Sequence, residues 1–136
     1  MNLLGRTKIV QSVAPVTSDT ALTETEIDCR GFDRVCHIIN VGAMVTGGTL
    51  DYKVQEAAAT GMANASDIAG AALTQVLAAS GASKVYAIDV PVNPAKPFQK
   101  AVATAGTANV TSGAVAVLYE GSGTFPKTAA KEAIIL

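Results

Sequence analysis

The sequence from Asp33 to Glu56, DRVCHIINVGAMVTGGTLDYKVQE, decides the fold. Its first half is apolar on both faces, which is typical of a central strand that is covered on both sides. In its second half, Leu50, Tyr52 and Val54 alternate with polar residues, and this alternation predicts a half-buried strand. Glycines between the two halves supply a turn. We therefore predict a central β-hairpin.

The rest of the chain repeats short strand patterns separated by Gly- and Pro-rich segments. This spacing predicts an all-β fold, either an antiparallel β-sandwich or a small barrel of about 7–9 short strands, with at most one short helix. Residues 66–80 can be interpreted in two ways. Their alanines favour a helix, whereas Gly70 and the brevity of the apolar run favour a strand or irregular structure, which is the interpretation we prefer.

The chain has 136 residues, which is the size of one domain. We expect a flexible N-terminal arm at residues 1–7, a β-sandwich domain at residues 8–121 and a C-terminal tail at residues 122–136. The alternation of the strands predicts a buried core made of Phe32, Val35, Ile39, Val41, Leu50, Tyr52, Val54, Val85, Ile88, Val115 and Val117.

The composition argues against several classes of partner. Ten basic and 11 acidic residues give a net charge of -1, so we expect no nucleic acid partner. The chain has three Phe, three Tyr and no Trp, so few aromatic side chains are present to form a base-stacking or sugar-binding platform. No apolar segment approaches the roughly 18 residues that span a bilayer, and the N-terminus does not have the pattern of a secretion signal. We therefore expect no membrane partner, and synthesis in a reducing compartment.

The sequence offers few candidates for catalysis or metal binding. His37 is the single histidine, and its apolar neighbours indicate a partly buried residue with a local hydrogen bond rather than a catalytic base. With Cys29 and Cys36 it would supply three metal ligands, but the sequence has neither the CxxC spacing of a zinc site nor a convincing fourth ligand. It also has no phosphate-binding loop and no acid–base pair of carboxylates. We expect no enzyme, no cofactor and no bound metal.

The two cysteines flank the segment CRGFDRVC, which reads as a turn. If the strands on either side of this turn pair with each other, Cys29 and Cys36 face each other. Intracellular thiols are normally reduced, so we favour two free thiols. An internal disulfide and a disulfide between subunits both stay open as alternatives.

Three segments together resemble a family of small virion proteins of tailed bacteriophages that are encoded near the major capsid gene. They are IDCRGFDRVCHIINVGAMVTGGTLDYKVQEA, SDIAGAALTQVLAASGASKVYAIDV and TANVTSGAVAVLYEG. The shared pattern is an Ile-Asp-x-x-Gly-Phe-Asp turn, an apolar strand that ends in Val-Gly, and a strand that runs into Gln-Glu. In this chain the pattern falls on Ile27, Asp28, Gly31, Phe32, Asp33, Val41, Gly42, Gln55 and Glu56.

The resemblance implies a head decoration, or cement, protein. Such a protein lies on the capsid exterior, binds between subunits of the major capsid protein, associates with itself as a homotrimer and is assembled in the host cytoplasm. The resemblance carries over no catalytic residue. Two alternatives stay open: another virion component of the neck, tail or a fibre, and a non-catalytic β-sandwich module that binds carbohydrate or protein.

Both ends of the chain carry large aliphatic residues, which expose apolar surface unless something covers them. We therefore predict that at least one terminus packs on another chain, either a sister subunit or the capsid protein. The alternative is that the last residues fold back onto their own sheet. The predicted partner-binding residues are Leu3, Leu4, Arg6, Ile134, Ile135 and Leu136.

Overall fold

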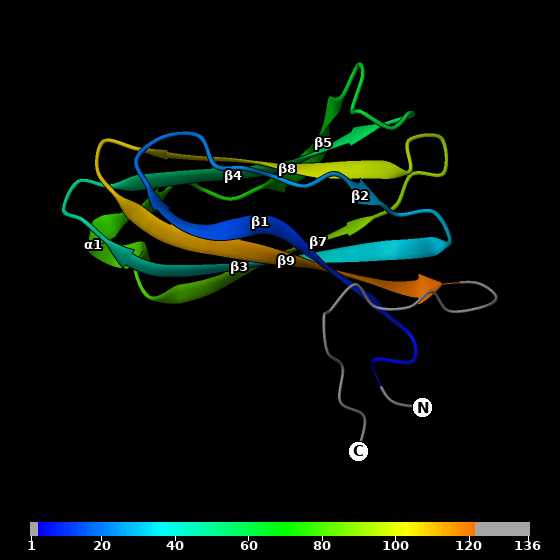
Figure 1. Cartoon of the computed structure of the whole chain (residues 1–136), viewed down its shortest axis with the longest axis horizontal. Coiled ribbons are helices and arrows are strands. Elements are labelled where there is room, and N and C mark those ends of the chain that lie inside the picture. Colours follow the sequence, from blue (N-terminus) through cyan, green and yellow to red (C-terminus); the bar gives the residue numbers. More distant parts are fainter. Residues whose placement is uncertain (1–2, 122–136) are drawn as a thin grey trace.

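In the computed structural model, residues 3–121 are described, and their strands form two antiparallel sheets packed face to face (Figure 1). β-branched and apolar residues dominate these strands, and they suit the half-buried, pleated surface of a sheet. The elements are β1 (Lys8–Ser18), β2 (Ile27–Asp28), β3 (Phe32–Met44), β4 (Thr49–Ala57), β5 (Ser66–Ala72), β6 (Val76–Leu77), α1 (Ala78–Gly81), β7 (Lys84–Pro91), β8 (Phe98–Gly106) and β9 (Val110–Gly121).

We call the two sheets lower and upper after their places in Figure 1. The lower sheet has the strand order β1-β9-β3-β7, and the upper sheet has the order β2-β8-β4-β5, with β6 pairing with the start of β4. This arrangement confirms the predicted all-β sandwich with one short helix, and the described strands do not close into a barrel. No helix among residues 3–121 has the length and hydropathy that crossing a membrane requires.

The predicted central hairpin is wrong, because its two strands belong to different sheets. β3 pairs with β7 and β9, whereas β4 pairs with β5 and β8. Each strand has one face of buried apolar side chains, which include Ile39 and Leu50, and these two faces enclose the interior from opposite sides. The connecting turn is tight: Gly47 has a φ of +85°, and the Gly48 amide donates to the Val45 carbonyl over 2.8 Å. The turn therefore carries the chain from one sheet to the other.

Most of the predicted core is confirmed, since these residues have exposures of 9% or less: Phe32, Val35, Ile39, Val41, Leu50, Tyr52, Val54 and Ile88. The prediction is wrong for β9, where Ala114 and Ala116 point inward, Val115 is 38% exposed and Val117 is half-buried. It is also wrong for Val85, which is 66% exposed. Both faces of β9 are apolar, so the alternation does not distinguish the inward face from the outward one.

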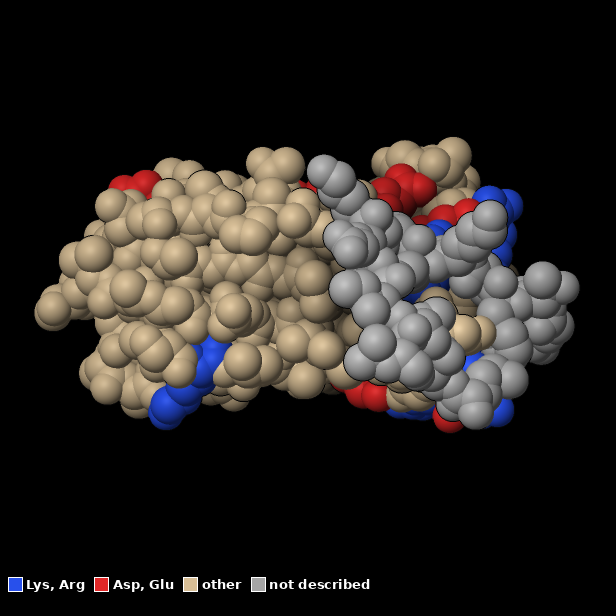
Figure 2. All heavy atoms as spheres, turned by 60° about the horizontal axis from the view of Figure 1, so that its bottom comes forward, with Lys and Arg blue, Asp and Glu red and all other residues tan. Residues whose placement is uncertain are grey.

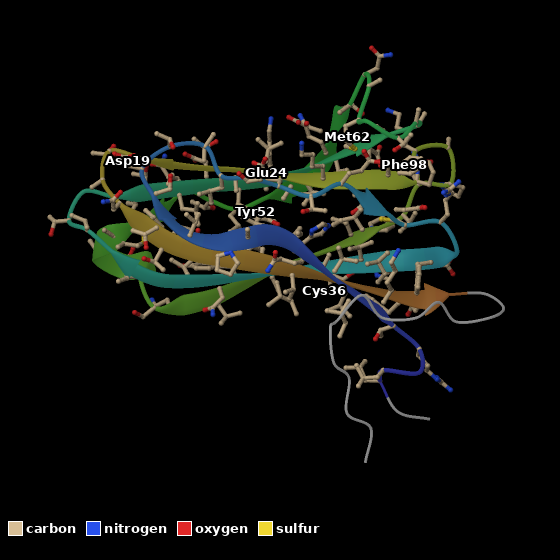
Figure 3. All side chains as sticks on the ribbon, in the orientation of Figure 1. Asp19, Glu24, Cys36, Tyr52, Met62 and Phe98 are labelled. Carbon is tan, nitrogen blue, oxygen red and sulfur yellow. The ribbon has the colours of Figure 1, made fainter. Side chains whose placement is uncertain are left out.

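Large and small side chains divide the interior between neighbouring strands. β3 and β4 contribute the large residues, which include Ile39, Leu50 and the Tyr52 ring that lies between the sheets (Figure 3). The strands hydrogen-bonded to them contribute alanines: Ala101, Ala103 and Ala105 from β8, and Ala114 and Ala116 from β9. Large side chains on one strand thus lie beside small ones on the next.

Residues 66–80 are mostly extended, as the preferred interpretation predicts. β5 runs antiparallel to β4, and β6 pairs with Thr49 and Leu50 at the start of the same strand. The helix α1 is limited to four residues, Ala78–Gly81. Gly81 has no room for a side chain, because a Cβ there would lie 2.3 Å from Val76 Cγ1. The alanine-rich segment therefore folds according to its strand pairing rather than its helix propensity.

His37 of β3 and Gln99 of β8 connect the two sheets inside the core. Both are 0% exposed, and His37 Nε2 lies 3.0 Å from Gln99 Oε1. The amide oxygen is an acceptor, so this hydrogen bond assigns the ring proton to Nε2. The other ring nitrogen, Nδ1, is buried without a hydrogen-bond partner among the described residues. Burial lowers the pKa of His37, because an imidazolium would lose its hydration there.

We expect Ile39→Ala to lower the free energy of unfolding by about 2–5 kcal/mol, because the substitution removes buried methyl and methylene groups and leaves a cavity. Thr104→Ala, at an exposed position of β8, is the control, and we expect it to change the free energy by about 1 kcal/mol or less. Urea unfolding followed by circular dichroism measures both. Equal losses at the two positions would contradict the assignment of the inward faces.

We also expect the free energy of unfolding to fall as the pH drops below about 6.5. In this range the unfolded chain binds a proton at His37, whereas the lowered pKa keeps the folded chain neutral, so falling pH favours the unfolded state. His37 is the single histidine, so His37→Gln should flatten the profile between about pH 7.5 and pH 5.5. Urea unfolding at a series of pH values measures both proteins. Equal slopes in the two proteins would contradict the prediction.

Candidate functional site

The outer face of the lower sheet carries apolar side chains on three adjacent strands. The outward positions of β9, β3 and β7 align, so that Val115 lies beside Ile38, and Ile38 beside Ala87. The next row places Val117 beside Cys36. We call this surface the outer patch and define it as Cys36, Ile38, Val85, Ala87, Val115 and Val117.

The outer patch differs from the usual solvent-facing side of an antiparallel sheet, which alternates apolar residues inward with polar residues outward. In the tan part of this side in Figure 2, the surface is broad and few charged side chains are visible. Val85 and Val115 expose 66% and 38% of their surface. An apolar surface shared by adjacent strands is typical of an interaction site.

A polar cluster borders one end of the outer patch and links three strands of the lower sheet. Arg34 of β3 donates from Nε to Asp89 Oδ1 over 2.9 Å and to the Tyr119 hydroxyl over 3.1 Å. The Tyr119 hydroxyl also donates to Asp89, and this hydrogen bond raises the pKa of Tyr119. Arg34 and Asp89 form an ion pair of 2.8 Å, so their charges cancel within the cluster.

The predicted partner-binding residues at the N-terminus lie in a turn that precedes β1. The Arg6 amide donates to the Leu3 carbonyl over 3.0 Å, and the Thr7 hydroxyl donates to the same oxygen over 3.0 Å. Leu3 is 66% exposed, Arg6 is exposed and Leu4 is half-buried. This segment, dark blue in Figure 1, extends below the lower sheet. The other three predicted residues, Ile134, Ile135 and Leu136, lie outside the described residues.

Both cysteines are free, and the fold places them in different surroundings. Cys29 follows β2, which pairs with β8 in the upper sheet, whereas Cys36 lies in β3 of the lower sheet (Figure 3). The strand pairing that would bring the two residues face to face is therefore not formed. Burial raises the pKa of Cys29 to about 12, and partial burial together with Asp89 raises the pKa of Cys36. Neither thiol is activated as a nucleophile.

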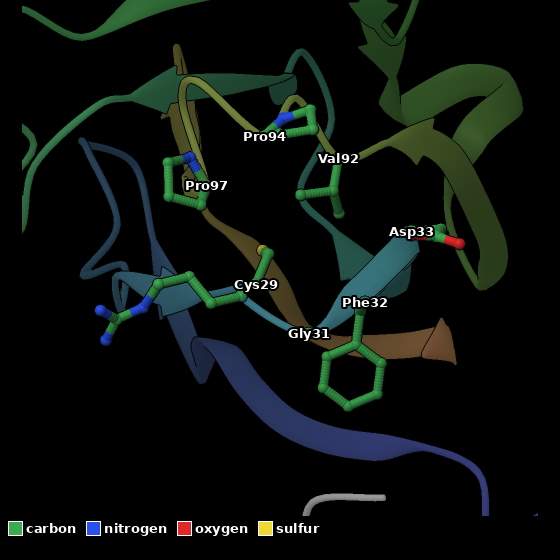
Figure 4. Close-up of a pocket in the computed structure, with 8 residues that line it drawn as sticks. Cys29, Gly31, Phe32, Asp33, Val92, Pro94 and Pro97 are labelled. Atoms are coloured by element: carbon green, nitrogen blue, oxygen red, sulfur yellow. The ribbon is translucent and has the colours of Figure 1, made fainter. Parts of the chain in front are cut away.

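A hollow of about 260 Å³ opens at the end of the sandwich where Cys29 turns into β3 (Figure 4). Its floor and walls come from the turn before β3 and from the proline-rich connection after β7. Nearby, Arg30 forms an ion pair of 2.6 Å with Asp28 and stacks on Phe98, 5.2 Å from the ring centroid. The lining residues are Cys29, Arg30, Gly31, Phe32, Asp33, Val92, Pro94 and Pro97. Their one thiol is protonated at neutral pH, so they contain no activated nucleophile.

His37 is placed in the core and does not reach the hollow or the outer patch. Its ring is 0% exposed and bonded to Gln99, so it has no access to a substrate. Among residues 3–121, no group of three or more His, Cys, Asp or Glu side chains is placed to hold a metal ion.

Sequence reasoning misses both features of the lower sheet's outer face. The outer patch has a signal, since both faces of β3 and β9 are apolar, but that signal also fits a strand covered on both sides within one domain. The polar cluster has no local signal. Arg34 is 55 residues from Asp89 and 85 residues from Tyr119, and only the strand register brings the three together.

Comparison with known proteins gives a fold likeness. No protein-family model matches the chain, and no curated protein matches it. A chain in the structure of infectious bursal disease virus, Gx strain, is similar to it with a TM-score of 0.50 and 14% identity, over 89% of this chain and 34% of that chain. A protein of the disulfide-linked pili of Bacillus endospore appendages matches with a TM-score of 0.35 and 14% identity, over 93% of this chain and 96% of that chain. The chain thus spans about a third of the length of the virus chain, with which it shares a fold.

Proposed function

We propose that this protein is a structural virion protein that decorates a bacteriophage capsid. It binds on the capsid exterior, between subunits of the major capsid protein, after assembly in the host cytoplasm. The observation that carries the proposal is the outer patch, an apolar sheet face on a chain with only 15% charged residues, because such a face fits a subunit of a larger assembly. The resemblance to small phage virion proteins supports this role, and so does a fold also found in a virus structure.

The proposed mechanism is passive and depends on buried area. Each square ångström of apolar surface removed from water contributes roughly 25 cal/mol, so a protein that packs on two capsid subunits at once opposes their separation. The role requires no catalytic residue, cofactor, nucleic acid or membrane.

Self-association, which the resemblance suggests is trimeric, strengthens such binding. A symmetric oligomer presents several copies of the N-terminal turn and of the C-terminal segment together. Each exposed leucine, such as Leu3, contributes little alone because ordering its segment costs chain entropy. Several copies on one oligomer act through a high effective concentration. We propose that Leu3 and Leu4 contact a sister subunit or the capsid protein, together with the aliphatic residues at the C-terminus.

The test is binding to purified phage heads that lack the protein. We expect the wild-type protein to cosediment with the heads and to saturate at a fixed ratio to the capsid protein. We expect Leu3→Glu to weaken this binding at least about tenfold, because burial of a leucine is worth about 1.5–3 kcal/mol and a tenfold change is about 1.4 kcal/mol.

Val45→Glu is the matched control. Val45 is an apolar residue with 55% exposure, in the turn between β3 and β4 at the other end of the sandwich, and its substitution should leave binding unchanged. Failure of the wild-type protein to bind heads would refute the decoration role. Equal binding by the wild-type protein and Leu3→Glu would refute the role of the N-terminal turn.

A further inference from the structure

We propose that the outer patch of the lower sheet is the surface on which a second copy of this chain packs. The inference gives a surface to the self-association of the proposed function, on which it rests, and two identical faces packed together join two copies rather than the three that the resemblance suggests. The contact places the β1-β9-β3-β7 sheet of one subunit against its sister subunit, so that Val115, Ile38 and Ala87 lie at the centre of the interface.

The arrangement of side chains suits a packed layer. Val115, Ile38 and Ala87 form one row across three strands, and Val117 and Cys36 form the adjacent row. All of them point outward, because the residues that alternate with them are buried, or half-buried in the case of Tyr86. Rows of small and medium apolar side chains on a regular sheet are the surfaces that pack face to face in β-sandwiches, about 10 Å apart.

The charges near the outer patch also suit a second copy. Few charged side chains are visible in the tan part of this side in Figure 2. At the end where the polar cluster lies, Arg34 and Asp89 form an ion pair of 2.8 Å within one subunit. This pair therefore brings no net charge to a contact between two copies.

The size of the face meets the requirement of a stable dimer. Four strands spaced about 4.8 Å apart give a width of about 19 Å, and the nine positions from Arg34 to Gly42 give a length of about 30 Å. Two such faces bury roughly 1,200 Å² in total, which is at the lower end of specific interfaces. An extended segment such as residues 122–136 would cover the width of one or two strands, whereas a second subunit covers all four.

Sedimentation velocity on the full chain over a range of concentrations tests the interface. We expect the wild-type protein to associate, and Val115→Glu to weaken association at least tenfold. Val102→Glu is the matched control, because it makes the same change on an outward position of β8 in the upper sheet, and it should associate like the wild type. Ala87→Glu, at an exposed position of β7, is the second patch variant if Val115→Glu does not fold.

Maleimide labelling under reducing conditions gives an independent readout. Cys29 is 0% exposed, so maleimide labels the native protein at Cys36, which lies within the outer patch. We expect the labelling rate of Cys36 to fall as the concentration of wild-type protein rises, and to be independent of concentration in Val115→Glu.

Three results would overturn the inference. A monomeric wild-type protein whose Cys36 is protected at every concentration would mean that the chain's own residues cover the patch. A monomer whose Cys36 labels freely would mean that no second copy binds. Equal losses of association in Val102→Glu and Val115→Glu would mean that the interface lies elsewhere. Binding to phage heads is measured in a separate experiment. A protein that self-associates through the outer patch but does not bind heads would refute the decoration role alone.

Discussion

The fixed volume of the interior is the constraint on which the rest of this structure depends. Ile39 of β3 and Tyr52 of β4 are large, and the residues paired with them are Ala114 of β9 and Ala103 of β8. Small inward side chains thus occupy the middle of β8 and β9, whereas Leu118 near the end of β9 is large and fully buried. The chain passes from the lower to the upper sheet between β3 and β4, and back to the lower sheet between β8 and β9. In each sheet, a strand with large side chains therefore lies beside a strand whose middle carries alanines.

This division of the interior also explains the character of the outer surface. In the middle of β9 the inward positions are Ala114 and Ala116, which lie beside Ile39 and His37 of β3. The β-branched Val115 between them therefore lies on the outward side, where it meets Ile38 of β3 in register. This part of the outer patch thus follows from how the core is packed.

The sequence predicts the positions of the strands well, because period-2 alternation and Gly or Pro breaks are local signals. It also predicts the inward face of β3 and β4, where Val35 and Leu50 are buried. It does not predict which strands are neighbours, because alternation shows which side chains share a face and not which strand lies alongside. For this reason the sequence predicts a hairpin between β3 and β4, where the chain in fact changes sheets. The prediction of which β9 residues point inward is wrong around Val115, because neither face of this strand is polar. The polar cluster around Arg34 depends on register alone.

The pairing of the first strand with the last has a consequence for synthesis. Val10 of β1 lies opposite Ala116 of β9, so β1 leaves the ribosome long before this ladder partner exists. β3 also waits for β7 and β9, which follow it in the chain. Neither sheet can be completed from neighbouring segments alone, and pairings between distant segments form slowly. The lower sheet therefore stays incomplete until β9 has been synthesised, and its apolar strands are exposed to other nascent chains during that interval.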